Sequence, residues 1–283
     1  MIELIKKEAL RMKRTGIKLT SLALALSLVL LSLSGCTFLS DLNDAILGLY
    51  DKPDEPEASE FKIEELINEI TTSTICAEVT INVEYRSVLS RPLGTVQGSG
   101  TVIMRTASTT LYVLTNAHCV TTPEDISSTK YNKTFYMTDY RGNVYSNGRV
   151  YAESISEKYD LALIAFDCGN WDVQPMTLAE KNPQINDTVI ALGAPHSQMN
   201  SITVGKATAY YESELLEVEA LYHTAPVGQG GSGGALLNTE LELCGVNFAA
   251  DETEEDFGNG SSIPIESVRE YLASFGIFDE ILN

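Results

Sequence analysis

From Ser73 onward the chain consists of short apolar segments separated by turn signals, and this pattern limits the fold more than any other feature of the sequence. Between Ile75 and Tyr85 the apolar side chains alternate with polar ones, as expected for a strand with one buried face. Many short strands at near-regular spacing, with few helices, are typical of a sandwich or a barrel. The sequence therefore predicts an all-β domain. Its expected strands are 75–85, 99–104, 110–114, 134–139, 144–151, 161–166, 188–192, 202–210, 215–223, 235–237 and 243–248.

A helix is expected at each end of this domain. Residues 61–70 place apolar side chains at helical spacing, which predicts a short amphipathic helix. Residues 265–275 follow Pro264 and precede Gly276, and these two residue types suit the start and the end of a helix. Of the 283 residues 44% are apolar, which is enough for a substantial core.

The first 36 residues have the pattern of a bacterial export signal. Six basic residues before position 19 outweigh two acids, and the stretch from Leu19 to Leu33 carries no charge. Ser34-Gly35-Cys36 then resembles the end of a lipoprotein signal, so residues 1–35 are expected to be removed and Cys36 to carry a lipid. The alternative is an uncleaved anchor, because the charge-free stretch extends to Gly35 and reaches the lower limit for a spanning helix. Both interpretations predict an extracytoplasmic location, on the cell surface or the periplasmic face.

Residues 36–60 are expected to form the lipidated N-terminus and an acidic linker. Seven acids and two prolines between Ser40 and Glu60 favour an extended, self-repelling segment. Residues 61–283 then form the folded domain. The chain has 39 acidic and 19 basic residues and a net charge of −20, which argues against nucleic acid as a partner.

Three segments carry groups suited to nucleophilic catalysis. His118 ends the segment Leu-Thr-Asn-Ala-His, Asp160 precedes Leu-Ala-Leu-Ile, and Ser232 lies within Gly-Gln-Gly-Gly-Ser-Gly-Gly. Taken singly, each has a structural interpretation: a packed histidine, the polar start of a buried strand, and a flexible loop. Together, in the order His, Asp, Ser, they match one of the few chain orders in which a catalytic triad occurs.

Over residues 73–275 the sequence resembles the trypsin-like serine peptidases, and within them the HtrA/Deg branch, here without a PDZ domain. The resemblance implies a chymotrypsin-like fold of two packed six-stranded antiparallel β-barrels with a C-terminal helix, which makes 61–283 a peptidase domain. Besides the three segments above, it rests on Gln97-Gly-Ser-Gly-Thr-Val, Arg141-Gly-Asn-Val-Tyr, Val189-Ile-Ala-Leu-Gly-Ala-Pro and Ser262-Ile-Pro-Ile-Glu-Ser-Val.

The resemblance assigns His118, Asp160 and Ser232 to a catalytic triad. A histidine within hydrogen-bond reach can take the proton of a serine hydroxyl, and a carboxylate orients the histidine. The N–H groups of Gly230 and Ser232 would form the oxyanion hole. The family usually has Asn or Asp just before the serine, whereas this chain has Gly231. We therefore expect a hole that is incomplete at rest and a low basal activity.

A substrate pocket is implied at Pro226, Val227 and Phe248, with no acid at its base. Such a lining favours a small or medium apolar residue before the scissile bond.

No metal or other cofactor is expected. The three histidines have no ligand spacing and no Cys-x-x-Cys occurs. The four cysteines after Cys36 allow three pairings, and none is assigned. The histidines are His118, His196 and His223.

The expected function is a membrane-tethered serine endopeptidase that cleaves polypeptides through an acyl-enzyme and contacts the membrane through its N-terminal lipid. One alternative is a non-catalytic or weakly active, holdase-like surface lipoprotein that binds peptide in the same cleft. Another is an esterase that uses the same triad. The sequence predicts no particular oligomeric state.

Overall fold

The computed structural model describes Glu65 and residues 77–123, 130–151, 153–169, 173–194, 201–251 and 257–282. The predicted signal, linker and N-terminal helix therefore lie outside the described residues, apart from Glu65. Within this part of the chain, no helix has both the length and the apolar character needed to cross a membrane.

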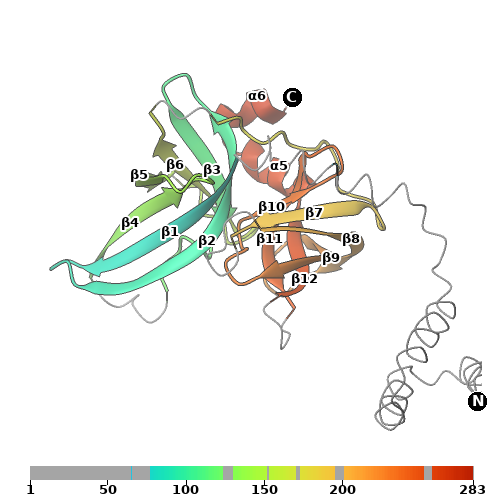
Figure 1. Cartoon of the computed structure of the whole chain (residues 1–283), viewed down its shortest axis with the longest axis horizontal. Helices are drawn as coiled ribbons and strands as arrows, with labels where there is room; N and C mark the ends of the chain where they lie inside the picture. Colours follow the sequence, from blue (N-terminus) through green and yellow to red (C-terminus); the bar gives the residue numbers. More distant parts are fainter. Residues whose placement is uncertain are drawn as a thin grey trace, which may run out of the picture. The chain divides into compact units, whose positions relative to one another are not determined.

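The described residues form two closed antiparallel β-barrels of six strands each (Figure 1). In the first barrel, teal to olive in Figure 1, the strand order is β1-β2-β3-β6-β5-β4. In the second, yellow to red, the order is β10-β11-β12-β9-β8-β7. This confirms the predicted chymotrypsin-like all-β fold. The strands are β1 Glu78–Ser87, β2 Pro92–Arg105, β3 Thr110–Asn116, β4 Tyr131–Thr138, β5 Val144–Val150, β6 Leu161–Asp167, β7 Thr188–Gly193, β8 Ser201–Glu212, β9 Glu219–Gly228, β10 Ala235–Leu237, β11 Leu243–Ala250 and β12 Phe257–Pro264.

Strand β6 shows why these segments become strands. Its first six residues are all buried, and Asp167, the seventh, is exposed. It pairs with β3 along its whole length and with β5 at two positions. A short apolar run buried on both faces is stabilised by about 25 cal/mol for each Å² of apolar surface removed from water. The same segment places Asp160, its immediate predecessor, at the end of β3.

Strand β12 was not predicted from the sequence, and its composition explains why. The segment Phe-Gly-Asn-Gly-Ser-Ser-Ile-Pro is rich in glycine and serine, which have low strand propensity. It is nevertheless a strand because it pairs with both β11 and β9 and so closes the second barrel. At Gly260 a Cβ atom would come within 2.2 Å of Cε1 of His223, so this strand must pass close to its neighbour. Strand β9 also lies later than predicted, at Glu219–Gly228 rather than 215–223.

Helix α5, Ile265–Ala273, follows β12 and contacts both barrels. Pro264 is its N-cap, and the predicted end at residue 275 lies just beyond the C-cap, Ser274. The helix contacts β11 and β12 of the second barrel. From the same helix, the hydroxyl of Tyr271 donates a hydrogen bond to the carbonyl of Ser154 in the first barrel at 2.6 Å. The chain ends with a 3₁₀ turn, Gly276–Phe278, and the short helix α6, Asp279–Leu282.

A buried glutamate, Glu78, begins the first barrel. Its side chain accepts a hydrogen bond from Oγ1 of Thr101 at 3.1 Å. Its other carboxyl oxygen, Oε1, has no hydrogen-bond partner among the described residues. Burial raises the pKa of this carboxyl well above its ordinary value, and the hydrogen bond from Thr101 offsets only part of the effect. Glu78 is therefore a group whose ionisation opposes folding.

We expect Glu78→Gln to make folding less sensitive to alkaline pH. A carboxyl with a raised pKa in the folded state binds more protons there than in the unfolded state, so stability falls as pH rises through the interval between the two pKa values. The variant should melt near the wild-type temperature at pH 4 and above it at pH 8, measured by circular dichroism. The control is Glu212→Gln on the exposed end of β8. An equal difference from wild type at both pH values would contradict this assignment.

Candidate active site

Asp160 holds His118 at two points. Its Oδ2 lies 2.7 Å from Nδ1 of the His118 ring. Its Oδ1 accepts a hydrogen bond from the His118 backbone N–H at 2.9 Å. A carboxylate can only accept, so in the neutral ring the proton lies on Nδ1 and Nε2 is left as the acceptor. The aspartate thereby fixes both the position of the histidine and its tautomer.

The backbone of Asp160 is fastened to the end of β3. Its carbonyl accepts hydrogen bonds from the N–H of Ala117 and from Nδ2 of Asn116, both at 3.0 Å. Its φ angle is +50°, in the left-handed region that aspartate tolerates better than most residues. Because β3 leads to His118 and β6 follows Asp160, the pairing of these two strands brings the histidine and the aspartate together.

The ring of His118 remains accessible, with 48% of its side chain exposed compared with 15% for Asp160. Burial is the largest single influence and alone would lower the pKa of His118, but the interactions with Asp160 and Cys119 together outweigh it and raise the pKa to about 10. An accessible ring with a free Nε2 can exchange a proton with a bound molecule. The pair therefore has the geometry of a general base and the carboxylate that orients it.

Ser232 lies in a turn of the second barrel, between β9 and β10, within residues 228–234, which we call the serine loop. Its hydroxyl donates a hydrogen bond to the carbonyl of Phe248 at 3.3 Å. Among the described residues, no hydrogen bond joins it to His118. In this resting arrangement the serine hydroxyl directs its proton toward a backbone carbonyl and not toward the histidine.

The serine loop forms a tight turn at Gly230. The N–H of Gly231 donates to the carbonyl of Gly228 at 2.9 Å, and Gly230 has a φ of +94°. A four-residue turn that is closed by this bond and has a positive φ at its third residue is a type II turn. The structure also explains the glycine at 231, where a Cβ atom would lie 2.9 Å from Cγ1 of Val227.

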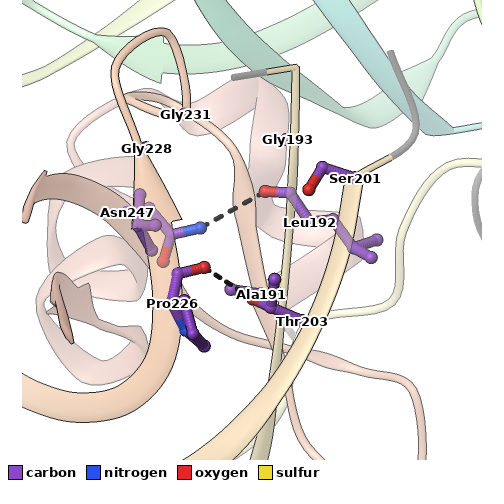
Figure 2. Close-up of a pocket in the computed structure, with 10 residues that line it drawn as sticks. Ala191, Leu192, Gly193, Ser201, Thr203, Pro226, Gly228, Gly231 and Asn247 are labelled. Atoms are coloured by element: carbon purple, nitrogen blue, oxygen red, sulfur yellow. Dashed lines mark hydrogen bonds between the residues drawn. The ribbon is translucent and has the colours of Figure 1, made fainter. Parts of the chain in front are cut away.

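The substrate pocket assigned to Pro226, Val227 and Phe248 stays a prediction. Pro226 and Val227 line a small pocket, whereas Phe248 is not part of its lining (Figure 2). The side chain of Asn247, at the same pocket, donates to the carbonyl of Leu192 at 3.3 Å, drawn dashed in Figure 2. The lining residues are Ala191, Leu192, Gly193, Ser201, Thr203, Pro226, Val227, Gly228, Gly231 and Asn247.

The remaining histidine of the described chain, His223, packs inside the second barrel. It is fully buried and its Nε2 lies 3.0 Å from Oγ of Ser262. Burial lowers its pKa to about 4, so it is neutral at physiological pH. His196 lies outside the described residues. The described residues hold no cluster of metal-ligating side chains.

The cysteines form no disulfide among the described residues. Cys119, Cys168 and Cys244 are buried thiols, and Cys76 lies outside this part of the chain.

Sequence reasoning missed one polar residue that contacts the serine loop. Ser99 of β2 lies in the segment Gly-Ser-Gly-Thr-Val, to which the sequence alone assigns no role in the site. A serine between two glycines inside a strand was the available signal, because glycines there often mark a close approach of two backbones.

The two barrels, the oriented histidine and the serine in a glycine turn define the chymotrypsin-like class of serine peptidases. A sequence model of the family described as "Trypsin-like peptidase domain" matches residues 98–246, more than half of the chain. The chain belongs to this family.

Relatives of known sequence are HtrA-type serine proteases. The chain is 24% identical to "Serine protease HTRA1A" of Danio rerio over 233 residues, covering 80% of this chain and 43% of the relative. It is 28% identical to "Serine protease HTRA2, mitochondrial" of Drosophila willistoni over 213 residues, covering 70% and 44%. The chain thus spans less than half the length of these relatives.

Solved structures of HtrA-type proteases share the fold. The structure described as "HtrA-type protease AlgW with decapeptide" superposes with a TM-score of 0.55 at 19% identity. The match covers 74% of this chain and 66% of that one.

Proposed function

We propose that the protein is an extracytoplasmic serine endopeptidase, tethered to a bacterial membrane by a lipid on Cys36, that cleaves polypeptides with His118, Asp160 and Ser232. The observation that carries the proposal is the double hold of Asp160 on His118, which leaves Nε2 as a proton acceptor. Bound peptide in the AlgW structure supports polypeptide as the substrate class.

In the proposed reaction, the hydroxyl of Ser232 turns from the carbonyl of Phe248 toward Nε2 of His118. The oxygen attacks the scissile carbonyl carbon while its proton passes to Nε2, and Asp160 stabilises the imidazolium that results. His118 then gives the proton to the leaving amine nitrogen as the C–N bond breaks, which leaves an acyl-enzyme. Water, activated by the same histidine, hydrolyses the ester and regenerates the serine.

The oxyanion of the tetrahedral intermediate is proposed to bind the N–H groups of Gly230 and Ser232. Neither group donates a hydrogen bond to any residue that the structure describes. Removal of one such donor typically costs about 2.7–4 kcal/mol of transition-state stabilisation. The low basal activity expected from Gly231 stays a prediction. The type II turn orients Gly230 without a side chain at position 231.

The tether rests on the sequence of residues 1–36 alone. A net charge of −20 repels the chain from anionic lipid, so a covalent lipid is the more effective anchor. Mass spectrometry of membrane-extracted protein should find Cys36 at the N-terminus with a diacylglyceryl group. Recovery of intact Met1 or Met12 at the N-terminus would favour the uncleaved anchor instead.

A second candidate function is a weakly active peptide-binding lipoprotein, and one observation bears on it. At rest the serine hydroxyl is bonded to Phe248 and not to His118. In structures without substrate, catalytic hydrogen bonds are often long or poorly aligned, so this observation is compatible with both functions. Incubation of the full chain with unfolded casein and with a peptide library separates them. New N-termini after small or medium apolar residues support the peptidase, whereas retention of peptide without cleavage supports the binding protein.

We expect the activity to rise with pH through a midpoint above 6.5, the ordinary pKa of histidine. The base must be neutral to take the serine proton, and the pairing with Asp160 keeps His118 protonated to a higher pH than an isolated histidine. The measurement is the pH profile of kcat/KM on a fluorogenic peptide. A midpoint clearly below 6.5 would show that Asp160 does not control the pKa of this histidine.

A further inference from the structure

Ser99 belongs to the first barrel, yet two of its hydrogen bonds go to the serine loop of the second barrel. Its N–H donates to the carbonyl of Ser232 at 2.7 Å. Its hydroxyl donates to the carbonyl of Gly230 at 2.8 Å. The residue is fully buried, so neither bond competes with water. One residue therefore holds the serine loop at two carbonyl groups.

These two carbonyls lie on either side of the amide of Ser232. The carbonyl of Gly230 belongs to the peptide unit that joins Gly230 to Gly231. The carbonyl of Ser232 belongs to the unit that joins Ser232 to Gly233. The N–H of Ser232 is carried by the peptide unit between them. Because both neighbouring units are fastened to Ser99, the direction of the Ser232 N–H is restricted.

Ser99 is itself fixed in one orientation. The N–H of Ala194 donates to its Oγ at 2.9 Å, and Oγ1 of Thr115 donates to its carbonyl at 2.7 Å. Since the oxygen accepts from Ala194, its own proton must point elsewhere, and it points to Gly230. Every polar group of Ser99 is paired, and the hydroxyl has no freedom to leave the loop without breaking two bonds.

A side chain at position 231 of the serine loop cannot supply the same restraint on the Ser232 N–H. A Cβ atom at Gly231 would lie 2.9 Å from Val227 and 3.0 Å from the carbonyl of Gly228. The Asn or Asp that the family usually has there would not fit without movement of the backbone. A side-chain restraint on the loop must therefore come from outside it. Ser99 supplies one, in addition to the loop's own backbone bonds from Gly231 to Gly228 and from Gly234 to Gly231.

We propose that Ser99 is a positioning residue, which acts through the serine loop to aim the Ser232 amide at the oxyanion. The proposal rests on the proposed peptidase function. The hydroxyl bond to Gly230 should therefore matter for the chemical step and not for the initial binding of a substrate or inhibitor.

The test is the inactivation of the full chain by a fluorophosphonate. Oγ of Ser232 attacks phosphorus, fluoride leaves with the electron pair of the P–F bond, and His118 takes the serine proton. The phosphonyl oxygen then occupies the oxyanion site. For Ser99→Ala we expect the maximal rate constant kinact to fall by roughly 10- to 100-fold, below the loss of a whole donor, while KI for the initial complex changes less than about twofold.

Ser154→Ala is a matched control. Ser154 is also fully buried in the first barrel, and its hydroxyl also makes two backbone bonds, both to Leu163 at 3.1 Å. Both variants should lose a comparable amount of thermal stability, but only Ser99→Ala should lose kinact. Ser99→Thr, which retains the hydroxyl, should recover part of the rate.

Each outcome decides the question. Equal kinact in Ser99→Ala and Ser154→Ala, with an active wild type, overturns the role of Ser99 and leaves the peptidase intact. A loss confined to KI also overturns it, because positioning of the amide would not act on the initial complex. A wild-type chain that the fluorophosphonate does not modify overturns the peptidase and the role of Ser99 together.

Discussion

Ser232→Ala should abolish peptide cleavage, with a fall in kcat of roughly six orders of magnitude if the triad acts as a unit. The reason is that the proposed mechanism makes the Ser232 hydroxyl the nucleophile, and alanine has no group that can replace it. The variant loses a single bond, from Oγ to the carbonyl of Phe248 at 3.3 Å, so its fold should remain intact. The measurement is turnover of a fluorogenic peptide by wild type and variant at the same concentration.

Two controls make this result specific. Ser213→Ala changes a partly exposed serine just after β8 and should leave turnover unchanged. Ser232→Ala should bind peptides as well as the wild type does, measured by fluorescence anisotropy. If Ser232→Ala retained more than a few per cent of the wild-type turnover, the serine would not be the nucleophile.

Asp160→Asn should lower kcat by about four orders of magnitude while the overall fold is retained. An amide at this position can donate to Nδ1 of His118, which would place the ring proton on Nε2, where it blocks proton transfer from the serine. The bond to the backbone N–H of His118 at 2.9 Å can survive through the remaining carbonyl oxygen. The pKa of His118 should fall in the variant, because the carboxylate that raises it is gone.

Asp167→Asn is the comparison for this variant. Asp160 precedes β6 and Asp167 ends the same strand, where it is exposed. It should show wild-type kcat and a wild-type His118 titration, followed by NMR of the imidazole protons. A similar loss of kcat in both variants would indicate a general effect on β6 instead of a role for Asp160 in the reaction.

The sequence predicted a strand well where an apolar run is bounded by polar residues at both ends. In β6 the apolar run lies between Asp160 and Asp167. It also placed His118 and Asp160 at the ends of paired strands. The register of β3 and β6 determines where the residues that flank these strands lie. It missed β12 because barrel closure, and not local propensity, makes a strand of that glycine-rich segment.

The fine geometry of the site could not be predicted in the same way. The hydroxyl of Ser232 bonds to the carbonyl of Phe248, and a side-chain rotamer of this kind leaves no pattern in the sequence. The contacts of Ser99 with the serine loop join residues 131 positions apart, so they arise from the docking of two barrels. The grouping of Pro226, Val227 and Phe248 in a substrate pocket stays a prediction. The first two line a small pocket, and the backbone carbonyl of Phe248 accepts the hydroxyl bond of Ser232.

The most direct test of the account is to locate the adduct that a fluorophosphonate forms with the full chain. Peptide mapping by mass spectrometry should find one modified residue, Ser232, in the wild type, and its formation should slow by at least a thousandfold in His118→Ala. An unmodified wild type, or an adduct at Ser232 that forms equally fast without His118, would contradict the claim that this histidine activates this serine.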